Sequence, residues 1–286
     1  MPARLAPRLL VAFLFLSSTS AASAQLLAAK DGPIVYGHHH LFVSNAEAHK
    51  KFWVDTLGGS SLTLSSGVQA VKFPNVFLLF RPQAPSAGTK GTTVDHIGFS
   101  VPDVRKVVEK LRAGGYRIAT REEAIDPRSI TDDIAVSAGG SSIVFVFGPD
   151  EVKVELVEVK SQTVPIALHH VHFFVPQNTE MQAWYAKVFG AVPRAGGGQF
   201  VSATLPGVTL NFSPSSQPVA GTTGRAIDHI GFEVRNLEAF TKKLEADGIP
   251  IKVSYRQVPK TDMFIAFITD PWGTQIELSE GLAALP

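Results

Sequence analysis

The sequence predicts an α+β protein built from four βαβββ modules arranged as two tandem domains. A strand pattern led by histidine returns four times, and a segment with helical periodicity follows each of these strands. The apolar or alternating segments after each helix are separated by Gly, Pro and Asp turns, as expected for further strands. The 286-residue chain is long enough for two domains that each bury a core.

The repeated strand places a histidine five residues before a valine. Its four copies read GHHHLFVSN, DHIGFSVPD, HHVHFFVPQN and DHIGFEVRN, with the histidines His38, His96, His170 and His229. Because side chains alternate between the two faces of a strand, each histidine is expected opposite the apolar, core-facing residues. The Asn or Asp after each valine is expected to cap the following helix, at Asn45, Asp103, Asn178 and Asn236.

Similar segments recur at offsets of 132 and 133 residues, which indicates a duplicated pair of modules. We assign residues 33–160 to a first domain and residues 166–283 to a second, joined by a short polar linker. The modules are expected to pair with their sequence neighbours inside each domain. The alternative is an exchange in which the first module pairs with the fourth and the second with the third.

The N-terminal residues 1–24 have the pattern of an export signal, with Arg4 and Arg8 before a short apolar run and Ala22 and Ala24 at the cleavage positions. This predicts a periplasmic or secreted protein that begins at Gln25 and has no membrane segment after cleavage; an uncleaved anchor is the alternative. Loss of the two arginines changes the formal net charge from +1 to −1, and a near-neutral chain argues against nucleic acid as a partner. The absence of cysteine excludes disulfides and thiolate ligands.

Each domain ends with a glutamate between apolar neighbours, Glu155 in KVELVE and Glu277 in TQIELSE. Alternation places both carboxylates on the face opposite the core, where a charge needs a partner. The repeated histidines lie on the corresponding face of their strands. Histidine and carboxylate side chains that share a face are candidate metal ligands.

The motifs DHIGF, HHVHFFV and DPWGTQIELSE resemble those of the vicinal oxygen chelate superfamily, over residues 33–282. This superfamily includes glyoxalase I, the fosfomycin- and bleomycin-resistance proteins and extradiol dioxygenases. The resemblance implies cupped sheets that surround a divalent metal. It implies six ligands, three in the first domain and three in the second: His38, His96 and Glu155, then His170, His229 and Glu277.

Two imidazoles and one carboxylate favour Fe(II), and Mn(II), Zn(II) or Ni(II) also fit this ligand set. The fourth, acidic ligand of the glyoxalase I pattern is missing, because residues 76–81 and 208–213 contain no acid. The sequence therefore favours a three-ligand site.

Other residues near the expected ligands are interpreted from their places in the strands. His40 and His172 are expected to line the pocket, and His172 or Tyr255 is the candidate for proton transfer. Gly98 and Gly231 are expected to leave space for substrate or to permit close strand packing. No site role is assigned to the remaining histidines of interest: His39 is expected to face the helix, and His49 and His169 are expected at the surface or at a strand end.

The sequence thus predicts an exported, divalent-metal-dependent enzyme that chelates a small-molecule substrate through two neighbouring oxygens. Extradiol-dioxygenase-like chemistry is favoured by the tandem domains and the three-ligand site. The alternatives are a glyoxalase-like lyase or isomerase, and a non-catalytic binding protein of the bleomycin-resistance kind.

Overall fold

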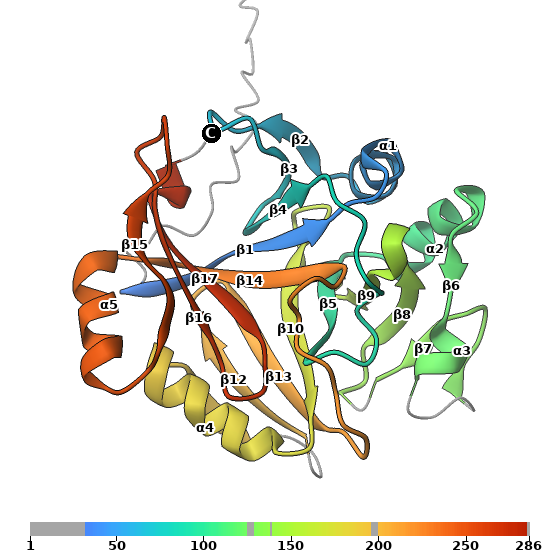
Figure 1. Cartoon of the computed structure of the whole chain (residues 1–286). Coiled ribbons are helices and arrows are strands. Elements are labelled where there is room, and N and C mark those ends of the chain that lie inside the picture. Colours follow the sequence, from blue (N-terminus) through green and yellow to red (C-terminus); the bar gives the residue numbers. More distant parts are fainter. Residues whose placement is uncertain (1–31, 125–128, 138, 196–199, 285–286) are drawn as a thin grey trace, which may run out of the picture.

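The computed structural model describes residues 32–124, 129–137, 139–195 and 200–284 (Figure 1). The predicted export segment and Gln25 lie outside the described residues. Within the described part of the chain, no helix is long and apolar enough to cross a membrane. Four modules follow one another, each opening with a strand and a helix and closing with further strands, which confirms the predicted α+β class.

The first two modules occupy the N-terminal half of the described chain. The first contains β1 (Ile34–Phe42), α1 (Ala46–Lys50), the π-helical turn η2 (Lys51–Thr56), β2 (Ser60–Thr63), β3 (Gln69–Phe73) and β4 (Val76–Arg81). The second contains β5 (Val94–Val101), α2 (Val104–Ala113), β6 (Arg117–Ile118), α3 (Thr120–Glu123), β7 (Ala135–Val136), β8 (Ser142–Phe147), η4 (Pro149–Glu151) and β9 (Lys153–Glu158).

The last two modules repeat this plan. The third contains β10 (Ala167–Val175), α4 (Asn178–Phe189), β11 (Val192–Ala195), β12 (Val201–Leu205) and β13 (Val208–Pro214). The fourth contains β14 (Ile227–Val234), α5 (Leu237–Ala246), β15 (Ile251–Gln257), β16 (Phe264–Thr269), β17 (Gln275–Glu280) and the short η5 (Leu282–Ala284).

Three of the four predicted helix caps are confirmed. The side chains of Asn45, Asp103 and Asn236 accept hydrogen bonds from backbone N–H groups in the first turns of α1, α2 and α5. The prediction at Asn178 is wrong, since this residue is the first helical residue of α4 and its amide donates to the carbonyl of Phe212.

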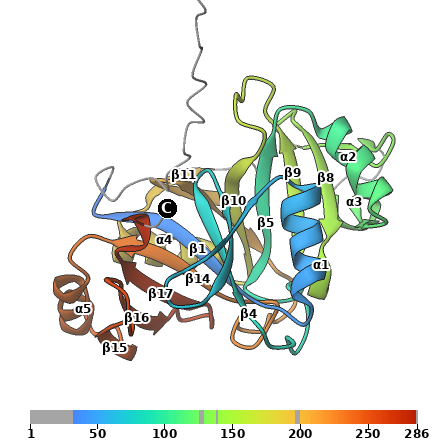
Figure 2. The ribbon, with the colours of Figure 1, turned by 90° about the horizontal axis from the view of Figure 1, so that it is seen from above.

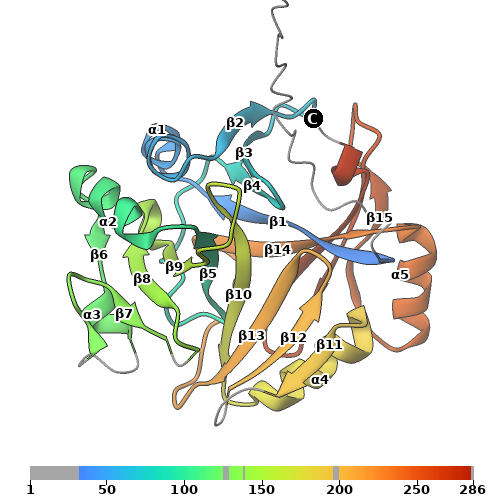
Figure 3. The ribbon, with the colours of Figure 1, turned by 180° about the vertical axis from the view of Figure 1, so that it is seen from behind.

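The modules pair by exchange, so the expected pairing of sequence neighbours is wrong. One sheet has the strand order β15-β16-β17-β14-β1-β4-β3-β2 and therefore joins the first and fourth modules. The other has the order β11-β12-β13-β10-β5-β9-β8-β6, with β7 beside β8, and joins the second and third. Figure 1 shows blue β1 beside orange β14, and Figure 3 shows β10 next to β5; both pairs are antiparallel.

Helical segments connect the two modules within each half of the chain. The helical segment of the first module packs against the second, where Trp53 of η2 contacts Phe99, and Figure 2 shows α1 on the same side of the molecule as α2. On the other side of the molecule, Phe189 of α4 stacks on Phe232 of β14. The two modules of each half thus meet through apolar contacts, while the sheet of each is completed by a module of the other half.

Bulges in β1 and β10 direct His38 and His170 to the sheet face opposite the core. The strand pairing shifts register between Tyr36 and His38, and again between Leu168 and His170. A bulge reorients side chains locally. As a result Tyr36 packs in the core against Phe232, while His38, two residues later, faces the opposite side.

Candidate metal centres

Two groups of side chains in the described chain have ligand atoms that all lie within 4.8 Å of one another. We call His38 of β1, His229 of β14 and Glu277 of β17 the first centre. We call the group around His96 of β5, Glu155 of β9 and His170 of β10 the second centre; His172 belongs to the same group. All six residues that the resemblance implied are brought together, but each centre combines the two halves of the chain.

A glycine lies in the middle of each centre. His38, Gly231 and Glu277 form one row across β1, β14 and β17. A Cβ atom built at position 231 would lie only 2.0 Å from Cε1 of the His38 ring. The missing side chain therefore lets the imidazole cross the middle strand and reach Glu277. The expectation that this space receives substrate is wrong, because the ligand histidine fills it.

The same row exists in the second centre, with His170, Gly98 and Glu155 across β10, β5 and β9. Here the Nε2 atom of His170 lies 3.1 Å from Oε2 of Glu155, and Nε2 of His96 lies 3.0 Å from the same oxygen. In the first centre, Oε2 of Glu277 lies 2.9 Å from Nε2 of His229 and 3.4 Å from Nε2 of His38.

An aspartate fixes one histidine of each centre. The Nδ1 atom of His96 is 2.8 Å from Asp95, and that of His229 is 2.7 Å from Asp228. Burial alone would lower the pKa of His96 and of His229, but hydrogen bonds to the aspartate and to the glutamate outweigh it and raise both pKa values. These contacts leave Nε2 as the nitrogen that faces the glutamate, the arrangement typical of a metal-binding histidine.

The two glutamates are held as carboxylates. Burial would raise the pKa of Glu155, but hydrogen bonds and charge from His170 and His96 hold it well below its usual range. In the same way, His38 and His229 hold the pKa of Glu277 below its usual range against the effect of burial. Both carboxylates are therefore ionised at neutral pH.

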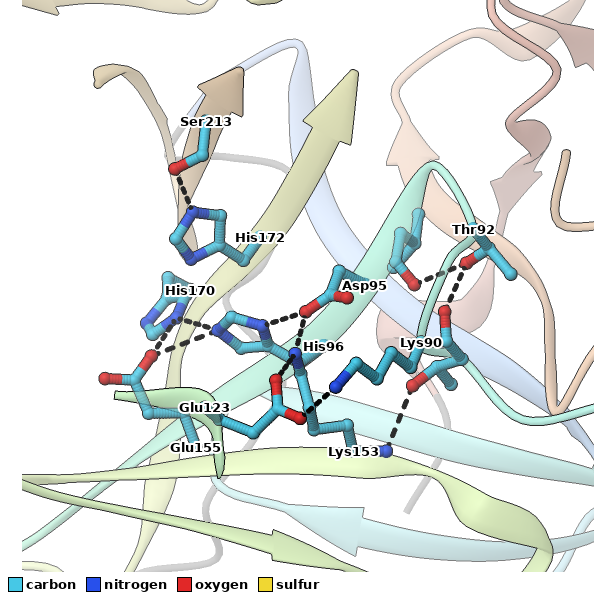
Figure 4. Close-up of polar contacts among 12 residues, drawn as sticks. Lys90, Thr92, Asp95, His96, Glu123, Lys153, Glu155, His170, His172 and Ser213 are labelled. Carbon is cyan, nitrogen blue, oxygen red and sulfur yellow. Dashed lines mark hydrogen bonds and ion pairs between the residues drawn. The ribbon is translucent and has the colours of Figure 1, made fainter. Parts of the chain in front are cut away.

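The second centre carries a network of charges that the first lacks (Figure 4). Lys153 is buried, with 4% of its surface exposed, and forms ion pairs with Asp95 and Glu123. Lys90 adds a second cation to Glu123 at 2.5 Å. The equivalent position in the first centre is Gln275, whose amide donates to Asp228 at 3.4 Å.

A cavity of ≈ 380 Å³ adjoins the second centre. His96, His172 and Ser213 line one part of it, and the aromatic rings of Phe145 and Phe174 line another. A cavity of ≈ 390 Å³ adjoins His40 at the first centre, and its lining is more apolar: it includes Val43, Val68, Phe80 and Pro82.

The two histidines expected to line the pockets do so, but they differ in their contacts. His40 lies with Nδ1 3.1 Å from Nε2 of His229. His172 lies with Nε2 2.8 Å from Oγ of Ser213. Burial and neighbouring His229 lower the pKa of His40 to about 3, and burial with His96 lowers that of His172 well below its usual range. Both are neutral at physiological pH.

Tyr255 does not join either centre. Its ring stacks on Phe264 at an interplanar angle of 6°, and both rings pack against the main core. His49 is wrongly predicted to be an ordinary surface or strand-end residue: it is fully buried, accepts a hydrogen bond from Trp53 and contacts Asp150.

The other two neighbouring histidines behave closer to expectation. His39 is buried on the core side, where it contacts the hydroxyl of Tyr36. His169 is exposed at the start of β10, and its Nδ1 atom lies 2.8 Å from Nδ1 of His170. This contact occupies the nitrogen of His170 that faces away from Glu155.

Sequence reasoning missed a phenylalanine beside each glutamate. Phe145 pairs with Glu155 across β8 and β9, and its ring edge meets His96. Phe267 pairs with Glu277 and meets His229 in the same way. Each phenylalanine lies ten residues before its glutamate, so the repeat held a signal for both.

The donor atoms of both groups fit a divalent metal. Each centre presents imidazole nitrogens and an ionised carboxylate, which suit Fe(II), Mn(II), Zn(II) or Ni(II). Both ring nitrogens of His38 are buried without a hydrogen-bond partner, and so is Nδ1 of His172. A buried polar atom without a partner costs about 1–3 kcal/mol, and a bound cation would give one ring nitrogen of each histidine a partner.

The comparison with known families agrees with this architecture. The model of the glyoxalase/bleomycin resistance protein/dioxygenase superfamily matches residues 35–156 and 167–278, most of the chain. The chain belongs to this superfamily. A search of curated proteins found no match.

Solved structures of superfamily members share the fold. Glyoxalase I from Zea mays is 18% identical, with a TM-score of 0.68 over 88% of this chain and 94% of that one. A mutant of glyoxalase I from the same species gives 17% identity and a TM-score of 0.69 over 90% and 97%. A putative dioxygenase from Bacillus subtilis is 14% identical, with a TM-score of 0.66 over 86% and 84%. At these identities the likeness establishes the fold alone.

On the strands next to the centres, the residues paired with the histidines are uncharged, as expected from the missing acidic fourth ligand. On β4, Phe77 pairs with His38 and Leu79 pairs with His40. On β13, Thr209 pairs with His170 and Asn211 with His172. The first centre of this superfamily member is therefore flanked by apolar side chains and the second by polar ones.

Proposed function

We propose that this protein is an exported, divalent-metal-dependent enzyme that binds a small molecule through two neighbouring oxygens. The observation that carries the proposal is the state of His38. Its imidazole is fully buried and neither ring nitrogen forms a hydrogen bond, although Nε2 lies 3.4 Å from the ionised carboxylate of Glu277. A metal ion held by His38, His229 and Glu277 would give one ring nitrogen of His38 the partner that it lacks.

A divalent ion held by two histidines and a glutamate supplies a Lewis acid that stabilises negative charge on a chelated oxygen. The protein's own residues prepare the site. Asp95 and Asp228 orient one ligand histidine each, and the ring edges of Phe145 and Phe267 pack against the same two histidines. The adjoining cavities of ≈ 380 and ≈ 390 Å³ have the size of a small-molecule site.

For the first centre we propose extradiol-dioxygenase-like chemistry, with Fe(II) as the metal. Three protein ligands would leave room on the ion for a bidentate substrate and dioxygen together. The apolar cavity beside His40 suits an aromatic ring, and Arg81 at its edge suits an anionic substituent.

The alternatives remain within the superfamily. A glyoxalase-like lyase or isomerase uses the same kind of chelation without dioxygen. A non-catalytic binding protein of the bleomycin-resistance kind is disfavoured by the two buried groups of histidine and carboxylate, since a cavity for sequestration does not need them.

The test begins with elemental analysis of the protein as purified and after reconstitution with Fe(II), Mn(II), Zn(II) or Ni(II). We expect close to two ions per chain, and loss of one of them in His229→Ala. Catechols should then be screened for oxygen consumption, and 2-oxoaldehydes for conversion in the presence of a thiol. Failure of every metal to bind at either centre would refute the proposal, and metal binding without any turnover would favour the binding-protein alternative.

Export is tested separately. The proposal requires cleavage after Ala24, so the mature protein recovered from the periplasm or the medium should begin at Gln25. Mass spectrometry that finds residues 1–24 retained on a cytoplasmic protein would refute it.

A further inference from the structure

We propose that Nδ1 of His172 is a fourth protein ligand in the second centre. The proposal rests on the proposed function, because it presumes that a divalent metal binds there. The position is unlike any ligand that the resemblance implied. His172 lies two residues after His170 on β10, and one ligand atom from each of His96, Glu155, His170 and His172 lies within 4.8 Å of the others.

The two nitrogens of His172 are in different situations. Nε2 is 2.8 Å from the hydroxyl of Ser213, whereas Nδ1 is buried and has no hydrogen-bond partner. If Nε2 carries the proton and donates it to Ser213, the lone pair of Nδ1 is free for a metal. A metal-bound histidine commonly uses its second nitrogen for such a hydrogen bond, which fixes the tautomer and the ring orientation.

Aromatic contacts also hold the ring in place. His172 stacks on Phe174 at an interplanar angle of 29°, and the edge of Phe200 lies 5.9 Å from it between ring centroids. Its centroid is 4.6 Å from that of His96 and 5.7 Å from that of His170. In Figure 4 the ring nitrogen opposite Ser213 points toward His170. The imidazole is therefore positioned at the centre before any metal binds.

The first centre provides an internal comparison, because His40 occupies the matching position on β1. Nδ1 of His40 contacts Nε2 of His229, and His40 does not belong to the first group of ligand atoms. The residue that matches Ser213 is Arg81, which lies over the ring of Phe42. The first centre thus lacks the hydroxyl that orients His172, and it keeps three ligands.

The number of ligands decides which chemistry each centre supports. Four protein ligands leave two positions on a six-coordinate ion, which is enough for two neighbouring oxygens but not for dioxygen in addition. We therefore assign dioxygen-independent lyase or isomerase chemistry to the second centre. This ligand role replaces the proton-transfer role that the sequence predicted for His172.

The experiment is a titration of the metal-depleted protein with Co(II), whose visible absorption reports the number and type of ligands. A His229→Ala background disables the first centre, so that the signal comes from the second. In this background, His172→Ala should weaken Co(II) binding at least tenfold and change the absorption spectrum. Ser213→Ala should give a smaller loss, because it removes only the contact that orients the ring.

The matched control is His40→Ala in a His96→Ala background, where only the first centre remains. There, Co(II) affinity should stay the same or increase, since His40 contacts a ligand nitrogen without joining the group. Circular dichroism checks the fold of every variant, and His172→Gln replaces His172→Ala if the latter unfolds.

The outcomes separate the two proposals. If the parent protein binds no Co(II), the proposed function fails. Suppose that the His229→Ala protein binds Co(II) at the second centre, and that its folded His172 variant binds Co(II) with the same affinity and spectrum. Then only the assignment of His172 as a ligand is overturned.

Discussion

Gly98 and His170 lie opposite each other on β5 and β10, and the imidazole occupies the space that a side chain at position 98 would need. A Cβ atom at this position would come closer than 3.0 Å to the ring, a separation that real Cβ atoms do not show. Glu155 lies on the far side of the same glycine. The contact between ligand histidine and glutamate therefore depends on glycine in the strand between them.

This relationship predicts that Gly98→Ala displaces His170 and lowers metal binding from two ions per chain to about one. Gly231→Ala should have the same effect at the first centre by displacing His38. Gly139→Ala is the control, because the nearest atom to a Cβ there is 3.8 Å away. Metal content by elemental analysis, with circular dichroism for the fold, provides the measurement. Two tightly bound ions in Gly98→Ala would contradict the prediction.

Local pattern predicted much of this architecture, because alternation and capping depend on residues close in sequence. The helix caps at Asn45 and Asp103 are examples, as is the placement of Glu277 opposite the core. Pairing of the modules could not be derived in this way. The four opening strands are alike, so neighbour pairing and exchange satisfy alternation equally. Contacts between modules, such as Trp53 of η2 on Phe99 and Phe189 of α4 on Phe232, join residues far apart in sequence and cannot be read from a local pattern.

The surroundings of several side chains also depend on the tertiary structure and do not follow from the local sequence pattern. Gly231 indicates a close approach, but only the pairing of β1 with β14 shows that His38 fills the space. The proton-transfer role predicted for Tyr255 does not fit its position, because its strand directs the ring to Phe264 and the core. His49 is buried through contacts with Trp53 and a distant turn.

Asp270 predicts a pH dependence of stability. Burial raises its pKa from 3.8 to about 6, although Tyr185 and backbone groups at Trp272 and Thr274 donate hydrogen bonds to it. Because the folded-state pKa is raised, the folded protein favours the protonated acid. The contribution of Asp270 to the free energy of unfolding is fully present below pH ~4 and is lost as the pH rises through 6. A shift of about two pKa units corresponds to a loss of about 3 kcal/mol.

Asp270→Asn should remove this loss, since the amide stays neutral and keeps an oxygen for the backbone donors. Its free energy of unfolding relative to the parent should therefore increase between pH 4 and pH 7. Urea denaturation in the presence of a chelator measures the difference, with the exposed Asp262→Asn as control. A difference that does not change with pH would show that Asp270 is already ionised without penalty.

The buried ion pairs of Lys153 at the second centre predict a contribution to folding stability. Its ammonium group is buried between the carboxylates of Asp95 and Glu123, so Lys153→Gln would leave buried acids with less compensation. We expect a loss of roughly 3 kcal/mol in the free energy of unfolding, as for other broken buried ion pairs. Lys106→Gln, which disrupts an exposed pair with Asp103, should cost less than about 1 kcal/mol. Equal effects of the two substitutions in urea denaturation would refute the prediction.

The exchanged pairing predicts how the two halves of the chain behave when they are separated. Residues 32–163 contain His38, His96 and Glu155, while residues 166–286 contain His170, His229 and Glu277. Neither half holds a complete centre, because His38 meets Glu277 across β14 and His170 meets Glu155 across β5. Each half alone also exposes strand edges that pair with the other half: β1 and β5 in the N-terminal half, β10 and β14 in the C-terminal half.

We therefore expect each half alone to aggregate or self-associate and to lose the native metal stoichiometry. Co-expression should give a soluble one-to-one complex with two metal ions, measured by size-exclusion chromatography and elemental analysis. His170→Ala in the C-terminal half should then remove the ion whose other ligands, His96 and Glu155, come from the N-terminal half. If residues 166–286 alone are monomeric and bind one ion through His170, His229 and Glu277, neighbour pairing is correct and the exchanged sheets are refuted.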